Sequence, residues 1–395
     1  MAGPGPHARA WRATLAGLCA TLVGIGLARF AYTPLLPALI TEGWFPASQA
    51  AYLGAANLAG YLGGALCARP LARRADAPRV LRGMMALVTV AFFACALPLS
   101  FAWFFLWRFA AGVAGGALMV LAAPTVLPHV PAARRGLAGG VIFTGVGLGI
   151  AASGTGVPRL LRAGLVETWC GLGALSLLLT ALAWGGWPAA TPAAIVAPAP
   201  APRRAPGGLA LRALYAEYAL NATGLVPHMI FLVDFVARGL GQGIEAGARY
   251  WVLFGVGAVA GPVLAGALAD RVGFGPALRL AFVAQAAAVA LPGVTAATPW
   301  LVLSSLVVGA AVPGIVPLVL GRVHELLPDD PEAQRAAWSV TTMAFALGQA
   351  AGAYGFSFLF AGGGAYAPLF ALAAGALTLA LVLDAAARLA APRPF

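Results

Sequence analysis

The sequence contains no lysine, and charged residues of every kind make up only 9% of its 395 residues. An average soluble protein is about a quarter charged, so a soluble fold of this length would lack the side chains needed to cover its surface. Hydrophobic residues amount to 61%. The composition therefore favours a chain solvated mostly by lipid over the two or three soluble domains that length alone would allow.

The few charges are strongly biased in sign. Arginine supplies all 24 basic residues against 12 acidic ones, which gives a net charge of +12. Such an excess is also the footprint of nucleic-acid binding, but these arginines lie mainly in short gaps between apolar runs. Basic residues concentrated in alternate gaps are typical of membrane orientation. We therefore expect no nucleic-acid partner.

Cysteine is scarce, and its placement argues against disulfides or a metal centre. Each cysteine lies inside an apolar run, far from any other: Cys19, Cys67, Cys95 and Cys170. The sequence also lacks a glycine-rich loop that would bind the phosphates of a nucleotide. We expect no metal, no cofactor and no pumping driven by ATP.

Long apolar runs dominate the chain. A helix needs about 20 apolar residues to cross a bilayer, and twelve runs satisfy this. They cover about residues 13–40, 47–68, 79–99, 101–124, 137–158, 166–187, 211–237, 247–269, 277–297, 299–321, 336–360 and 366–389. The first run is too long for a cleaved signal peptide, whose apolar part has about 7–15 residues. We interpret it as a retained first span.

The arginines outside the spans predict the orientation. The N-terminus, the C-terminus and every second loop together hold 18 of them, while the other loops hold only Arg159, Arg162, Arg238 and Arg249. Because cytoplasmic loops carry the excess of basic residues, both termini are predicted to be cytoplasmic. Only an even number of spans allows that.

The longest gap divides the chain into two halves. Residues 188–210 are rich in proline and alanine, a composition typical of an extended linker. The segment Gly64–Arg69 resembles Gly266–Arg271, 202 residues later. We predict an all-α membrane protein of twelve transmembrane helices, with six-helix bundles at 1–187 and 211–395 joined by that linker, an architecture known among transporters.

Two arginines lie inside the predicted spans, where a charge is costly. Arg29 lies about 16 Å inside the outer end of the first span, with Tyr32 and Thr33 on the same helical face. It either binds a substrate or is satisfied by carbonyl groups of neighbouring helices. Arg108 lies about 10 Å inside the fourth span, so it either serves function or extends to the outer interface, where Trp107 fits an aromatic belt.

The seventh span carries a polar stripe. Glu217, Asn221, Gly224 and His228 follow one another at spacings of four, three and four residues, which places them on one helical face. A carboxyl group and an imidazole on one apolar helix can relay protons. The stripe is equally compatible with polar contacts between packed helices. Asp234 lies off the stripe near the outer end, either in solvent or as a partner for the arginine of the first span.

Several motifs resemble the major facilitator superfamily. The segment Gly266–Gly273 is similar to its loop signature, in which an acidic residue and an arginine pair at a helix end, here Asp270 and Arg271. The resemblance implies a gating role for this loop, and we expect Asp270 to contact an arginine or a helix N-terminus. In the loop after the second span, the acidic position of the signature is occupied by Ala68.

A narrower resemblance covers both halves. The segments Gly26–Pro37 and Tyr52–Tyr61 are similar to the bacterial YbfB/YjiJ-like group, and Arg108 with Gly112 resembles the fourth-helix motif of the superfamily. This likeness implies a fold in which the first, fourth, seventh and tenth helices line the cavity. It also implies transport across a bacterial inner membrane.

The sequence thus predicts a monomeric, proton-coupled secondary transporter of a small organic solute, which is not an enzyme. A non-transporting membrane sensor or scaffold is the alternative. The predicted site residues are Arg29, Tyr32, Arg108, Asn221 and His228 for the substrate, Glu217 and Asp234 for proton coupling, and Asp270 and Arg271 for the gating loop.

Overall fold

The computed structural model describes residues 6–131, 134–188, 208–328 and 330–390, and within these ranges every regular element is a helix. The chain divides into two compact units. One consists of Met1–Ala197 with Gln242–Val252, and the other of Pro198–Gly241 with Leu253–Phe395. The predicted all-α class is confirmed. The predicted linker 188–210 falls mostly outside the described residues.

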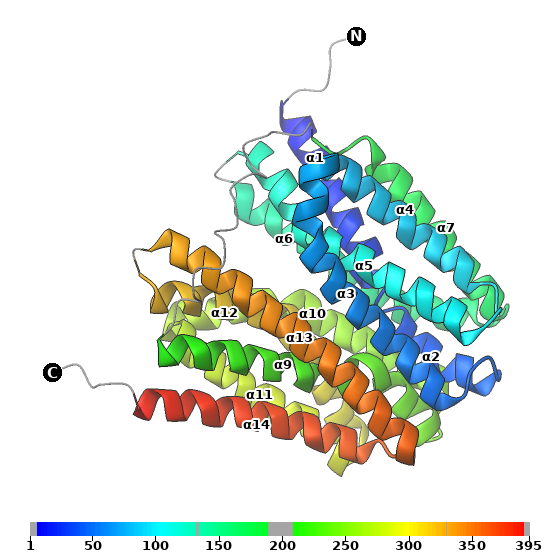
Figure 1. The fold of residues 1–395 in the computed structure, drawn as a ribbon. Coiled ribbons are helices and arrows are strands. Elements are labelled where there is room, and N and C mark those ends of the chain that lie inside the picture. The colour runs from blue at the N-terminus through cyan, green and yellow to red at the C-terminus, as the bar shows by residue number, and fades with distance from the viewer. Residues whose placement is uncertain (1–5, 132–133, 189–207, 329, 391–395) are drawn as a thin grey trace, which may run out of the picture. The chain divides into compact units, whose positions relative to one another are not determined.

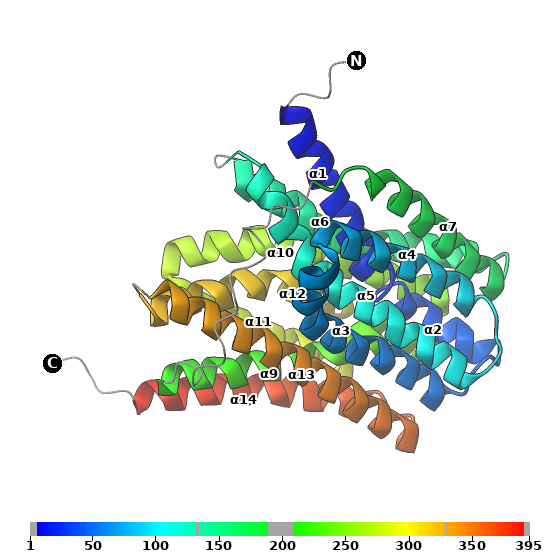
Figure 2. The same cartoon turned by 45° about the horizontal axis from the view of Figure 1, so that its top comes forward.

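The first unit is built around long helices that lie side by side in pairs, with α3 against α5 and α4 against both α5 and α7 (Figures 1 and 2). Its elements are α1 (Pro6–Thr21), the π-helix η1 (Leu22–Leu27), α2 (Tyr32–Thr41), α3 (Ala47–Ala75), α4 (Ala77–Cys95), α5 (Phe101–Val126), the short η2 (Leu127–His129), α6 (Arg135–Leu160) and α7 (Leu165–Trp184).

In the second unit, α9 packs against both α13 and α14, and α11 packs against α12 and α14 (Figure 1). Helix α10 (Ile244–Val272) contributes its first turns to the first unit and the rest to the second. The other elements are α9 (Leu209–Asp234), the π-helix η4 (Phe235–Gly239), α11 (Phe274–Val294), α12 (Thr298–Leu326), α13 (Pro331–Gly363) and α14 (Ala367–Leu389).

Eleven of the twelve predicted spans coincide with helices that are long and apolar enough to cross a membrane, counted over the described residues. The exception is α3. Its 29 residues make it about 43 Å long at the helical rise, but its apolar character is diluted. It carries Gln49 and Asn57 and ends on Arg73 and Arg74.

The two units repeat one helix crossing. Helices α3 and α10 both have 29 residues, and α10 begins 197 positions after α3. A Cβ atom on Gly60 would lie 2.1 Å from the carbonyl oxygen of Phe109 in α5, and one on Gly257 would lie 2.2 Å from that of Leu306 in α12. The partners are again 197 positions apart. Contact this close requires glycine, so the packing fixes the register of the repeat.

This register corrects the sequence comparison, which aligned the halves about five residues out of step. Small residues recur throughout the chain, so several offsets look alike in sequence. With the structural offset, Leu71–Arg82 corresponds to Leu268–Arg279. The residue equivalent to Asp270 is therefore Arg73 and not Ala68.

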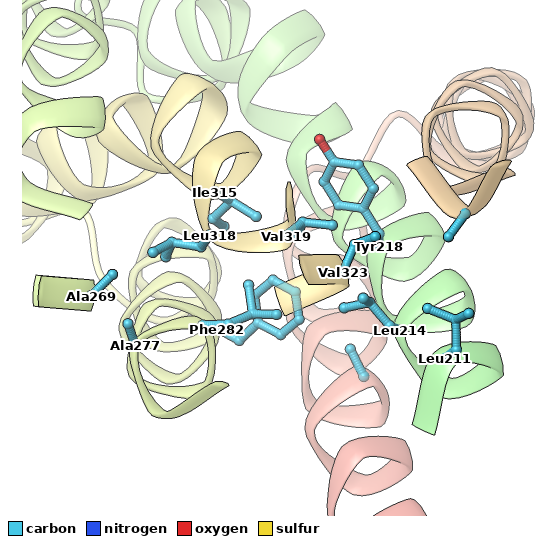
Figure 3. Packing of buried hydrophobic residues seen from close by; sticks show 13 residues of the cluster. Leu211, Leu214, Tyr218, Ala269, Ala277, Phe282, Ile315, Leu318, Val319 and Val323 are labelled. Atoms are coloured by element: carbon cyan, nitrogen blue, oxygen red, sulfur yellow. The ribbon is translucent and has the colours of Figure 1, made fainter. Parts of the chain in front are cut away.

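An apolar cluster of the second unit lies where several of its helices converge. Figure 3 shows Leu214 and Tyr218 of α9, Phe282 of α11, and Val319 and Val323 of α12 packed into one cluster, and all five side chains are at most 4% exposed. Leu214 and Phe282 of this cluster also line the cavity in which Glu217 lies.

Candidate functional site

The first predicted span is interrupted at Arg29. Helix α1 passes into η1 at Leu22, and α2 begins only at Tyr32. In between, the N–H of Ala28 bonds to the carbonyl of Val23 at 3.0 Å, five residues back, which is the wide turn of a π-helix. Arg29 lies in this break. Regular α-helical spacing, which predicts that Tyr32 shares a helical face with Arg29, therefore does not apply here.

Close contact between backbones accompanies the break. A Cβ atom on Gly26 of η1 would lie 2.7 Å from the Cα of Gly149 in α6, and one on Gly145 would lie 2.5 Å from the carbonyl oxygen of Leu18. Gly145 and Gly149 of the fifth predicted span therefore serve packing at this crossing, as small residues do in membrane bundles.

Arg108 is directed into the first unit and does not extend to an interface. Its side chain is only 3% exposed, and Nη1 donates to the carbonyl of Ala28 at 2.7 Å. The guanidinium lies 4.2 Å from the ring centroid of Tyr32, whose hydroxyl donates to the carbonyl of Ala50 at 2.6 Å. Arg108 and Tyr32 thus tie the interrupted first span to α5 and α3.

Arg29 is the more accessible of the two arginines, because its side chain is half-buried. Its guanidinium carbon lies 5.2 Å from the ring centroids of both Phe30 and Tyr61, within the range of cation–π attraction. A planar guanidinium held against aromatic rings has a defined orientation. That suits recognition of a carboxylate or another planar acceptor.

Two members of the polar stripe on α9 make contacts between helices. The amide of Asn221 donates to Gln285 of α11 at 2.7 Å. His228 Nε2 lies 2.8 Å from the hydroxyl of Ser304 on α12, which itself donates to the carbonyl of Ala288. Because that hydroxyl has one proton, it accepts from His228 Nε2–H. These contacts agree with the packing interpretation of the stripe.

Glu217 differs from the other stripe residues. It is only 4% exposed, yet it lines a small, partly open cavity together with Arg279, Arg322, Asp384 and Arg388. These partners come from α11, α12 and α14. None of these four residues stands out in the sequence, because all lie near span ends, where charged residues are expected.

Ion pairs connect the cations around this cavity. Arg279 and Arg388 both approach Asp384, at 2.9 and 3.0 Å, and Arg322 pairs with Glu325 at 2.9 Å. Asp384 is thus shared by two arginines, while Arg322 has an acidic partner on its own helix. Among the described residues no ion pair within 4 Å involves Glu217 itself. A buried carboxyl group therefore lies beside cations already paired with other acids.

Asp234 is fully buried, so the alternative that places it in solvent is wrong. The π-helix η4 extends the chain beyond it, so Arg238 folds back and its Nη2 donates to Asp234 at 2.7 Å. The hydroxyl of Tyr366 donates to the same carboxylate at 2.6 Å. Burial, reinforced by the negative charge of Asp234, raises the pKa of the Tyr366 phenol.

The predicted gating pair lies at the surface. Asp270 and Arg271 are both exposed, and Asp270 makes no ion pair with any described residue. The carboxylate at the start of α11 is that of Glu325. Glu325 accepts from the backbone N–H groups of Phe274 and Gly275 at 2.9 and 3.2 Å, which stabilises the start of α11.

The first unit caps the equivalent helix locally. Asp76 and Gly273 occupy equivalent turn positions, with φ angles of 55° and 84°. The side chain of Asp76 accepts from the N–H of Arg79 at 2.9 Å and so caps α4. Because glycine has no side chain, Glu325 supplies the corresponding acceptor from another helix. In the sequence, the replacement of Asp76 by a glycine at the equivalent turn becomes visible when the two halves are aligned at an offset of 197 residues.

Comparisons with known proteins agree with this architecture. A family model described as "Uncharacterised MFS-type transporter YbfB" matches residues 21–385. No protein with a curated description matches the chain. A crystal structure of a bacterial homologue of the human lysosomal transporter Spinster, inward-facing and occupied, has 17% identity and a TM-score of 0.71, and the alignment covers 98% of this chain and 96% of that one.

Two further structures are similar in fold. A mutant of the nucleoside transporter NupG has 14% identity and a TM-score of 0.75, with 95% of this chain and 99% of that chain covered. The xylose transporter XylE from E. coli, in a partially occluded inward-open conformation, has 16% identity and a TM-score of 0.73, with 95% and 97% covered.

Proposed function

The chain belongs to the YbfB-type family of MFS transporters, and on that basis we propose that it is a proton-coupled carrier of a small organic solute. The carrier works by alternating access in a bacterial inner membrane. It has twelve spans, with α3 as the second. Residues 188–210 link the two halves on the cytoplasmic side, where both termini and the 18 arginines also lie.

The observation that supports proton coupling is the position of Glu217. Its carboxyl group is buried in a cavity lined by three arginines, and two acids, Asp384 and Glu325, already pair with them. When Glu217 loses its proton, it competes with Asp384 and Glu325 for these cations. When it binds a proton, that competition ends. Protonation of one residue on α9 thereby alters contacts with α11, α12 and α14.

For the solute we propose a contact with Arg29. This side chain is half-buried in the break of the first span, and its guanidinium lies near two aromatic rings, an arrangement suited to the anionic or polar part of a solute. Arg108, Tyr32, Asn221 and His228 act by positioning helices, because their polar groups bond to neighbouring helices.

Transport by purified protein in liposomes tests this proposal. Nucleosides and pentoses begin the solute panel, since NupG and XylE share the fold, and organic acids extend it because of Arg29. Uptake of at least one solute should depend on a pH gradient in the wild type. Glu217→Gln, which retains shape but cannot titrate, should lose that dependence and retain solute exchange.

The matched control is Glu245→Gln. Glu245 lies at the start of α10 and pairs with Arg162 at 2.9 Å with both side chains well exposed. This variant should remain driven by the gradient. Full gradient-driven uptake by Glu217→Gln would contradict the coupling role, whereas absence of uptake of every solute by wild-type protein would contradict transport of these classes.

A further inference from the structure

A second, smaller cavity lies inside the first unit, between α4, α5, α7 and the interrupted first span. It is small and partly open, with room for about one water-sized particle. Its walls are mostly apolar, with Phe92 from α4 and Ala111 from α5 among them. Three side chains with N–H groups also line it, Trp107 and Arg108 from α5 and Trp169 from α7.

These three side chains each leave a donor unused. Arg108 Nε, Trp107 Nε1 and Trp169 Nε1 are buried and have no hydrogen-bond partner among the described residues. The indole N–H of the neighbouring Trp103 does have a partner, since its Nε1 donates to the carbonyl of Ala94 at 2.8 Å. Most buried donors in proteins find a partner. Three donors without a described partner, on residues that line one cavity, favour a bound acceptor there.

The positive charge of Arg108 also lacks a counter-charge in its unit. That unit contains four acidic residues, Glu42, Asp76, Glu167 and Glu245, and none of them is buried. Asp76 and Glu245 already pair with exposed arginines. The guanidinium of Arg108 is buried against a carbonyl and an aromatic ring, with no carboxylate of the described residues in an ion pair with it. A buried cation without a carboxylate is costly, and an anion in the cavity removes that cost.

We propose that this cavity binds one small anion of the halide class, which accepts hydrogen bonds from Arg108, Trp107 and Trp169. The lining supplies N–H donors and a positive charge but no carboxylate, so it selects against cations. A space of this size is far too small for an organic ligand. The bound anion would hold the interrupted first span against α5. This proposal does not depend on proton coupling or on the identity of the solute.

Thermal unfolding of the purified full-length protein tests the proposal. Chloride should raise the unfolding midpoint saturably relative to isethionate at equal ionic strength, because a ligand that binds only the folded state stabilises it. Trp169→Phe and Trp107→Phe keep an aromatic ring and remove one donor each. In both, the half-saturating chloride concentration should rise by roughly tenfold, equivalent to about 1.4 kcal/mol.

Trp187→Phe is the matched control. Trp187 Nε1 is also buried without a described partner, but Trp187 does not line the cavity, so this variant should respond to chloride as the wild type does. Bromide, which quenches indole fluorescence on contact, gives a second measurement, with a saturable component expected in the wild type. Equal midpoints in chloride and isethionate would show that only water fills the cavity and would overturn the proposal. An identical chloride response of Trp169→Phe and Trp187→Phe would overturn it as well.

Discussion

The hydroxyl of Tyr366 donates a hydrogen bond of 2.6 Å to the buried carboxylate of Asp234 and thereby joins the start of α14 to the end of α9. Arg238 completes the cluster by donating to the same carboxylate. Because Asp234 is fully buried, these two donors supply the compensation that its charge requires. The cluster fixes one end of α9, the helix that carries Glu217.

Tyr366→Phe removes one of these donors and leaves the ring in place. We expect a loss of about 1–3 kcal/mol in the free energy of unfolding, as for other buried groups deprived of a partner. Tyr215→Phe is the control. The hydroxyl of Tyr215 is buried without a described partner, so its removal should be neutral or stabilising. Equal losses in the two variants, measured by denaturant unfolding, would show that the bond to Asp234 contributes nothing.

The same contact predicts a dependence on pH. The pKa of Tyr366 is raised in the folded state, so its contribution is complete below the ordinary tyrosine value of about 10. It declines as pH rises from there through the folded-state pKa, because the unfolded chain releases the proton first. The stability difference between wild type and Tyr366→Phe should be constant from about pH 6 to 9 and shrink above pH 10. A constant difference at higher pH would contradict this.

The repeated helix crossing predicts a matched pair of unfavourable substitutions. A Cβ atom on Gly112 would lie 2.0 Å from the carbonyl oxygen of Asn57, and one on Gly309 would lie 2.1 Å from that of Phe254. Both carbonyl oxygens belong to the backbone, so neither can move away from an added Cβ atom without displacing its helix. Gly112→Ala and Gly309→Ala should each destabilise the protein by about 1–3 kcal/mol, as overpacking does.

Gly83→Ala is the control for this pair. Gly83 lies inside α4 with no other atom within 4 Å of an added Cβ, so alanine should stabilise the helix by up to about 1 kcal/mol. Thermal unfolding of the three variants provides the comparison. Wild-type stability of Gly112→Ala would show that α3 and α5 separate at no cost.

The two arginines of the first unit should respond differently to lysine. Arg29→Lys keeps the charge and loses the planar fork, so solute affinity should fall by at least about tenfold, or 1.4 kcal/mol, with normal folding. Arg108→Lys should lower thermal stability, because lysine has no planar group to lie over Tyr32 while bonding to Ala28. Wild-type affinity in a folded Arg29→Lys protein would exclude direct recognition of the solute by the guanidinium.

Much of this protein follows from sequence alone. With 9% charged residues and long apolar runs, the chain has few ways to satisfy its backbone other than helices in lipid. The spans therefore appear in the sequence as runs of sufficient length. The buried position of Glu217 was also predictable, because its helix is apolar on both sides of it.

The structure alone decided which polar groups meet. The break at Arg29 arises from π-type bonds and from glycine contacts with α6, and neither has a periodic signature in sequence. Arg279, Arg322, Asp384 and Arg388 lie far apart along the chain, so only the packing of α9, α11, α12 and α14 brings them to Glu217. Hydrophobic burial is nearly additive along a sequence. Hydrogen bonds and ion pairs instead depend on angstrom-scale distances between distant segments, and these distances are set only when the helices pack.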